Sequence, residues 1–123
     1  MDCQIDSGPC SRAPGGDPLT RIIFDIKPKP VVPMKRLRFS VTAMHGGKAI
    51  EATHVSVSLS MPGMYMMENN IPLRRVSDGR YEGEGVIVRC TSGRRVWRAD
   101  ISLRRPGEDR SGPVASFHFR VAP

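Results

Sequence analysis

The sequence has few aromatic residues, few cysteines and no long apolar run. Of its 123 residues, 6% are aromatic, and the chain has three cysteines. No stretch approaches the roughly 18 consecutive apolar residues of a membrane-spanning helix. The length fits one domain with a single core and excludes a large two-domain enzyme. We therefore predict a one-domain protein with no transmembrane segment, and tethering to a membrane by other means stays open.

Catalytic motifs are also lacking. The three histidines, His45, His54 and His118, lie in no HExxH pattern, and neither a GxSxG turn nor a phosphate-binding glycine loop is present. Glu82 and Glu84 share one face of a predicted strand, where two carboxylates are usually solvated rather than catalytic. The sequence therefore predicts a protein that is not an enzyme.

Basic residues outnumber acidic ones, 19 to 12, which gives a net charge of +7. They occur mostly as pairs spread along the chain, such as Arg74-Arg75 and Arg94-Arg95, and aromatic residues do not alternate with them as they do on base-stacking surfaces. We therefore predict no nucleic-acid binding. Binding of another polyanion through the arginine pairs is a weaker alternative.

The chain divides into two parts. Residues 1–18 are rich in Gly and Pro, hold two cysteines and show almost no hydrophobic pattern, which predicts a flexible N-terminal tail. Residues 19–123 alternate between apolar and polar side chains in about seven short segments separated by Pro, Gly and Asn, and no segment has a helical period. We predict an all-β domain, an immunoglobulin-like two-sheet β-sandwich, with an eight-stranded up-and-down barrel as the alternative. The segments start near Ile22, Leu37, Val55, Ile71, Tyr81, Trp97 and Ala115, and that of Tyr81 is expected to extend to Cys90.

Methionine is locally abundant. Four of the seven methionines lie in Met61-Pro62-Gly63-Met64-Tyr65-Met66-Met67, and thioether sulfur is a ligand that selects Cu(I). Met61 continues an inward-facing strand pattern, so Met64, Met66 and Met67 are the candidate ligands. Met44 and His45 join them if the two turns meet at one end of the sandwich. The alternative is that the methionines fill the core or form an adaptable surface for protein contacts.

Three short patterns resemble a known family. They are the Met-rich turn, the Gly79-Arg80-Tyr81 strand start and the spacing from Gly93 to Trp97, all within residues 19–121. Together they resemble the YtkA-like and FixH-like group of small extracytoplasmic β-sandwich domains. The resemblance implies a bacterial envelope protein with a non-enzymatic role, and for some members a connection with copper supply to respiratory oxidases.

Three cysteines allow three pairings, each leaving one thiol over. We expect a Cys10–Cys90 disulfide, which would fix the tail to the sandwich in an oxidising compartment, and three free thiols are the alternative. The polar, cysteine-bearing start also predicts that a leader has been removed and that the protein is periplasmic or tethered to the cell surface as a lipoprotein.

These patterns together predict a non-enzymatic binding module of the bacterial envelope. Its cofactor would be Cu(I), held by the Met-rich turn. The alternative is an interaction or assembly module that contacts an envelope protein through the same apolar turn or a free sheet edge, without metal.

Overall fold

The alternating segments form strands, which a computed structural model describes for residues 3–63, 69–89, 93–107 and 112–123. All seven predicted segments are strands, and two short strands, β1 and β4, accompany them. The bounds are η1 (Ile5–Ser7), β1 (Cys10–Arg12), η2 (Pro14–Gly16), β2 (Thr20–Lys27), β3 (Leu37–His45), β4 (Lys48–Ala49), β5 (His54–Ser60), β6 (Asn69–Ser77), β7 (Arg80–Gly85), β8 (Val96–Arg104) and β9 (Gly112–Arg120), where η marks a single 3₁₀ turn.

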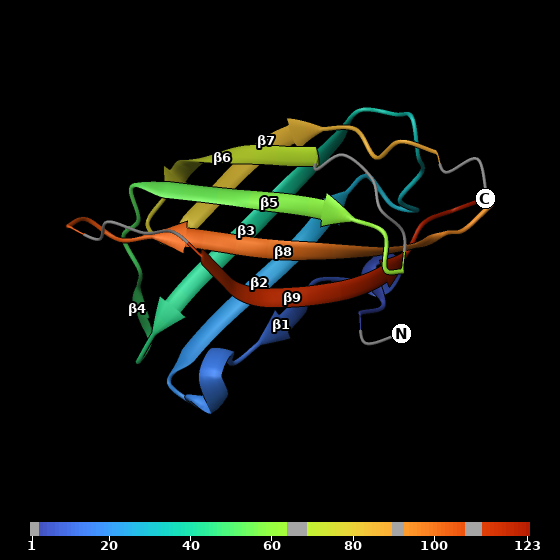
Figure 1. Ribbon diagram of the computed structural model, residues 1–123. Helices are drawn as coiled ribbons and strands as arrows, with labels where there is room; N and C mark the ends of the chain where they lie inside the picture. The colour runs from blue at the N-terminus through green and yellow to red at the C-terminus, as the bar shows by residue number, and fades with distance from the viewer. Residues whose placement is uncertain (1–2, 64–68, 90–92, 108–111) are drawn as a thin grey trace.

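The strands form two layers that cross at an angle (Figure 1). β2, β3 and β7 belong to one layer, β5, β8 and β9 to the other, and β6 pairs first with β5 and then with β7. Apart from the two short strands, the orders β2-β3-β7-β6 and β5-β8-β9 match those of immunoglobulin constant-type domains. The predicted immunoglobulin-like sandwich is confirmed. The up-and-down barrel is wrong, because β7 lies between β3 and β6.

The core lies between the layers and is built by every second residue of the strands. In β2, for example, Ile22, Phe24 and Ile26 are buried and the residues between them are not. Phe24 from one layer stacks on Phe117 from the other, with ring centroids 5.3 Å apart. Trp97 is 1% exposed, as its place in the pattern predicts. The period of two therefore determined which side chains fill the core.

β7 ends earlier than the sequence predicts. The expected strand from Tyr81 to Cys90 ends at Gly85, and no strand is assigned to residues 86–89. Gly83 lies so close to β6 that a Cβ atom there would be 2.4 Å from the carbonyl oxygen of Pro72. Because that approach is too close for any side chain, glycine is required where β6 passes from one layer to the other.

The N-terminal segment is packed against the sandwich, unlike the flexible tail predicted for residues 1–18. Cys3 and Ile5 are 1% and 2% exposed, and β1 pairs with β2. The Cys3 amide donates a hydrogen bond of 3.0 Å to the His118 carbonyl oxygen in β9, and the Val31 amide donates one of 2.8 Å to Asp6. From residue 3 onward, this segment therefore belongs to the folded domain.

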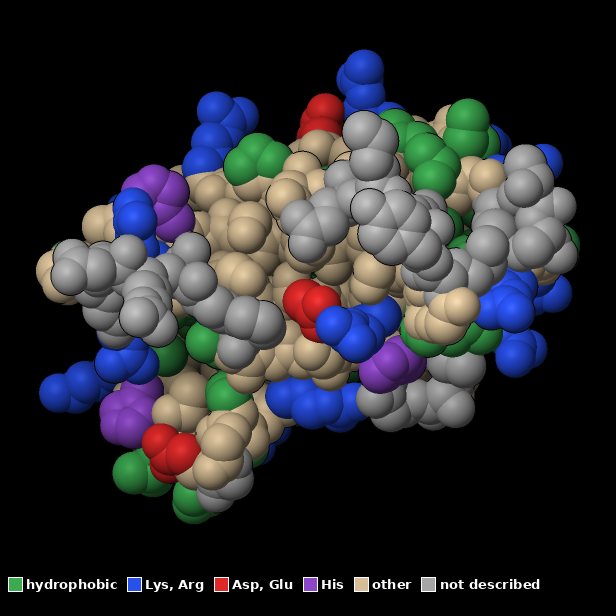
Figure 2. All heavy atoms as spheres, viewed as in Figure 1, with side chains coloured by type: hydrophobic (Ala, Val, Ile, Leu, Met, Phe, Trp, Pro, Cys, Tyr) green, Lys and Arg blue, Asp and Glu red, His purple; other side chains and the backbone are tan. Residues whose placement is uncertain are grey.

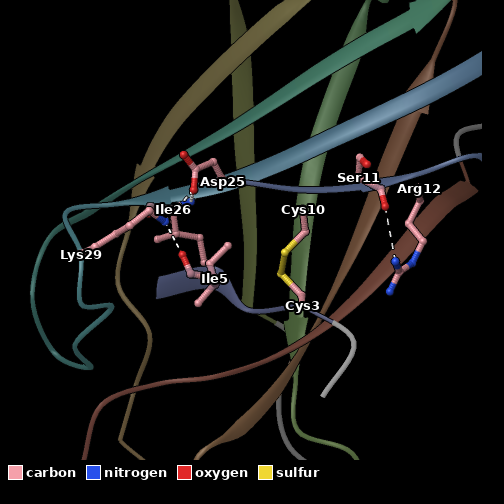
Figure 3. The surroundings of a disulfide bond; sticks show 8 residues. All are labelled: Cys3, Ile5, Cys10, Ser11, Arg12, Asp25, Ile26 and Lys29. Atoms are coloured by element: carbon pink, nitrogen blue, oxygen red, sulfur yellow. Dashed lines mark hydrogen bonds and ion pairs between the residues drawn. A yellow bond between two sulfur atoms is a disulfide. The ribbon is translucent and has the colours of Figure 1, made fainter. Parts of the chain in front are cut away.

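Cys10 bonds to Cys3 rather than to Cys90 (Figure 3). The turn η1 and the start of β1 bring the two Cα atoms to 5.7 Å, a normal separation for a disulfide. The predicted Cys10–Cys90 bridge is therefore wrong, and Cys90 itself lies outside the described residues. Beside the bridge, the Lys29 ammonium donates hydrogen bonds to the Ile5 carbonyl oxygen and to Asp25, which further fixes the segment (Figure 3).

Candidate functional site

Met44 and His45 lie at the opposite end of the sandwich from Met61, with which the Met-rich turn begins. His45 is the last residue of β3, and β5 begins near it, after the short β4. β5 then crosses the molecule over seven residues, about 20 Å at the rise of a strand, before Met61 starts the turn (Figure 1). The fold therefore does not bring Met44 and His45 to the described start of the turn, Met61 to Gly63. Met64, Met66 and Met67 lie outside the described residues, so their binding of Cu(I) stays a prediction.

The His45 end, which we define as residues 17–20 and 43–50, is a set of turns closed by hydrogen bonds. The Thr20 hydroxyl donates to Asp17 Oδ2 at 2.9 Å and lies 2.8 Å from His45 Nδ1. The backbone amide of Leu19 also donates to Asp17, and this bond, then that of Thr20, lowers the pKa of the Asp17 carboxyl.

The side chains at the His45 end are hydrogen-bonded to one another. The Thr20 hydroxyl donates to the Asp17 carboxylate, and His45 Nδ1 lies within hydrogen-bond distance of the same hydroxyl oxygen. Among the described residues, no three His, Cys, Asp or Glu side chains are grouped so that they would hold a metal ion. These contacts join the turn before β2 to the end of β3.

The other end of the sandwich is formed by loops that hydrogen-bond to one another. We call it the pocket end and define it as residues 31–35, 61–63, 86–89, 93–95 and 121–123. The Met34 amide donates to the Ile87 carbonyl oxygen at 2.8 Å, and the Ala122 amide donates to that of Val31 at 2.8 Å. Arg94 reaches the Pro62 carbonyl oxygen at 3.4 Å, beside the start of the Met-rich turn.

A small apolar pocket opens at this end, with a volume of about 200 Å³. The Trp97 side chain lies at its base, since it lines the pocket and is 1% exposed. A cavity of about 150 Å³ accepts a benzene ring, so this pocket has room for one large apolar side chain. Its walls are Pro33, Val88, Val121, Ala122 and Pro123, with Arg89, Gly93, Arg94 and Arg95 around them.

The surface around the pocket combines exposed apolar side chains with positive charge. Met34 is 61%, Val86 39% and Val88 43% exposed. The described residues of the pocket end include four basic side chains and no Asp or Glu; the basic ones are Lys35, Arg89, Arg94 and Arg95. Figure 2 shows hydrophobic and basic side chains next to each other at the right-hand end of the molecule.

The sequence pattern drew attention to the Met-rich turn, which begins at the pocket end, but not to the pocket itself. Val86 and Val88 read as alternating residues of a strand, whereas they are exposed beyond the end of β7. Met34 gave one usable signal, because it lies between Pro33 and two basic residues in a segment that cannot be a strand. The structure gives it a left-handed conformation, with φ 69°, which is rare for a residue other than glycine.

No protein-family model and no curated protein matches this chain. Among solved structures, it is similar to a DUF4785 family protein from Legionella pneumophila, with a TM-score of 0.61 and 12% sequence identity. The match covers 86% of this chain but 29% of that protein. At this identity the similarity shows the fold alone, and the resemblance to the YtkA-like and FixH-like group stays a prediction. In the part of the chain that the structure describes, no helix has the length and apolar character needed to cross a membrane.

Proposed function

We propose that this chain is a non-enzymatic binding module of the bacterial envelope that holds a partner protein at the pocket end. The observation that carries the proposal is the apolar pocket over Trp97, surrounded by Arg89, Arg94 and Arg95. An apolar pocket with a few charged groups around it is a common design of recognition sites. The partner segment would insert one large apolar side chain and place carboxylates beside the arginines.

Met34, which directly follows Pro33 in the pocket wall, also supports this proposal. Its left-handed backbone costs about 1–2 kcal/mol for a residue with a Cβ atom. The side chain gains little from the core in return, since it is 61% exposed. Strained, exposed apolar residues gather at binding surfaces, where the contact with a partner compensates for the cost.

The envelope location is supported by the Cys3–Cys10 disulfide. Structural disulfides form and persist mainly in oxidising compartments such as the periplasm and the cell surface. A count of free thiols tests this location. Protein isolated from its native host under alkylating conditions should have one free thiol per chain. Three thiols per chain would indicate a reducing compartment.

A photo-crosslinking residue at position 88 tests the proposed contact, with position 76 as the control. Val76 is comparably exposed, at 51%, but lies on β6 away from the pocket. Position 88 should capture a partner that position 76 does not. The purified partner should then bind Arg89→Glu about tenfold more weakly than wild type and Arg21→Glu within twofold of it. Equal capture at both positions, or equal affinity of the two variants, would show that the pocket end is not the contact.

Copper binding is a second candidate, now restricted to the Met-rich turn. Four methionines in seven residues favour it, and the separation of the two ends removes Met44 and His45 from the ligand set. In competition with a Cu(I) chelator, Met64→Leu with Met66→Leu should lose affinity, while Met44→Leu and His45→Ala should not. A wild-type protein that fails to compete even with a weak chelator would leave the protein contact as the function of the turn.

A further inference from the structure

A second open site lies outside the pocket end, on the outer face of the layer that contains β2 and β3. This groove has a volume of about 560 Å³. Its lining holds four basic side chains and one carboxylate, together with the apolar Pro28 and Leu37; the charged residues are Lys27, Lys29, Arg36, Arg38 and Glu84.

Two of these cations lie side by side, and no described residue forms an ion pair with either of them. Lys27 in β2 is directly opposite Arg38 in β3, and both point away from the core. Like charges in a directly opposed cross-strand pair destabilise a sheet. No hydrogen bond or ion pair of either side chain is found within the described residues.

The neighbouring charged groups do not neutralise this pair. Glu84 is opposite Arg38 on the other side, but its ion pair is with Arg36, at 3.7 Å from Nε to Oε2. Lys29 is already bound to Asp25 at 2.7 Å. The groove therefore keeps an ammonium and a guanidinium next to each other without an anion between them.

We propose that this groove binds a phosphate-bearing ligand, with a phosphate group between Lys27 and Arg38. A guanidinium binds two phosphate oxygens at once, and an ammonium adds a third contact as a compact charge. A phosphate dianion would neutralise both cations, and the apolar wall at Pro28 would accept the uncharged part of a phosphoester. The site does not depend on the pocket end, which uses other residues.

Calorimetric titration tests this, with inorganic phosphate, pyrophosphate and vesicles of phosphatidylglycerol as three separate probes. Binding of the soluble probes alone assigns a free phosphoester, and binding of the vesicles alone assigns a lipid headgroup. Phosphatidylcholine vesicles are the control for the latter. Absence of binding to all three probes overturns the proposal.

Two variants locate the site. Lys27→Gln and Arg38→Gln should each weaken binding about tenfold, because each removes a charged hydrogen-bond donor. Arg21→Gln, an exposed position on the same strand and face but outside the groove, should stay within twofold. In the absence of ligand, Lys27→Gln should keep or raise the melting temperature, because it removes a repulsion. Equal losses in all three variants, or a lower melting temperature for Lys27→Gln, would mean that the pair has a structural role only.

Discussion

The loops at the two ends of the sandwich differ in length and in character, and the long connections from β2 to β3 and from β7 to β8 lie at the pocket end. At the His45 end, polar side chains are hydrogen-bonded to one another, and Asp17, Thr20 and His45 close a turn. At the pocket end, the loops are joined mainly through backbone groups, which leaves Met34 and Val88 exposed beside arginines. Polar groups that satisfy one another have little left to offer a partner. Exposed apolar side chains around a pocket can still contact a partner, which is why we propose the pocket end as the binding surface.

We expect the largest effect on stability from replacing Trp97, the buried side chain under the pocket. Trp97→Ala should lower the free energy of unfolding by about 3–5 kcal/mol, because it removes a large core side chain. His45→Ala, at the other end, should cost less than about 1 kcal/mol, since that side chain is half exposed. Urea unfolding followed by circular dichroism measures both. Equal losses of unfolding free energy in the two variants would show that the two ends contribute alike to stability.

The disulfide should stabilise mainly the pocket end. Closing the loop from Cys3 to Cys10 is worth about 2–3 kcal/mol in the chain-entropy model, so Cys3→Ser with Cys10→Ser should lose that amount. Hydrogen exchange should then become faster at the Val31 amide, which donates to Asp6 beside the bridge. Exchange at Ala43 and Ile50, which are joined by a hydrogen bond at the His45 end, should not change. Faster exchange at both ends would contradict this assignment.

Met34 allows a gain of stability at the pocket end. Met34→Gly should raise the free energy of unfolding by about 1 kcal/mol, because glycine adopts φ 69° without strain. The same variant should weaken partner binding, since it removes an exposed apolar side chain. Differential scanning calorimetry and the affinity measurement check the two effects. A stabilised variant with unchanged affinity would remove Met34 from the binding surface.

The smallest effect is expected from acid at the His45 end. Hydrogen bonds from Leu19 and Thr20 lower the pKa of Asp17 from its ordinary value of 3.8. A lowered pKa in the folded state stabilises the protein above pH 3.8, and this contribution disappears as the pH falls through the folded-state pKa. Melting temperatures of wild type and Asp17→Asn should therefore differ slightly at pH 5 and converge at low pH. If the difference between the two melting temperatures grows towards low pH, the pKa of Asp17 is not lowered in the folded state.

The sequence predicted the strands better than the connections. Alternation placed Phe24, Trp97 and Phe117 in the core correctly, because a strand with one buried face must repeat every two residues. It did not predict that Cys3 and Ile5 are buried, since two apolar residues in a polar segment have no period. Their burial depends on a partner far along the chain, the His118 carbonyl oxygen in β9.

The candidate site, too, was only partly predictable from the sequence. The Met-rich turn marked the pocket end by its composition, whereas the pocket needs Pro33, Val88 and Trp97 from three separate segments. Val88 is exposed beyond Gly85, the last residue of β7. Contacts between distant segments leave no period in a sequence, so pattern reasoning had no means of finding them.

By itself, the sequence determined the all-β class, the seven main strands and the inward face of each, because the pleat of a strand converts alternation directly into orientation. Only the tertiary structure decided which loops share an end of the sandwich. β5 separates the Met-rich turn from His45, and the N-terminal segment joins β9 and the loop at Val31. Such placements are set by strand order and register, which result from packing the two sheets together, and they in turn decide which side chains meet at a binding surface.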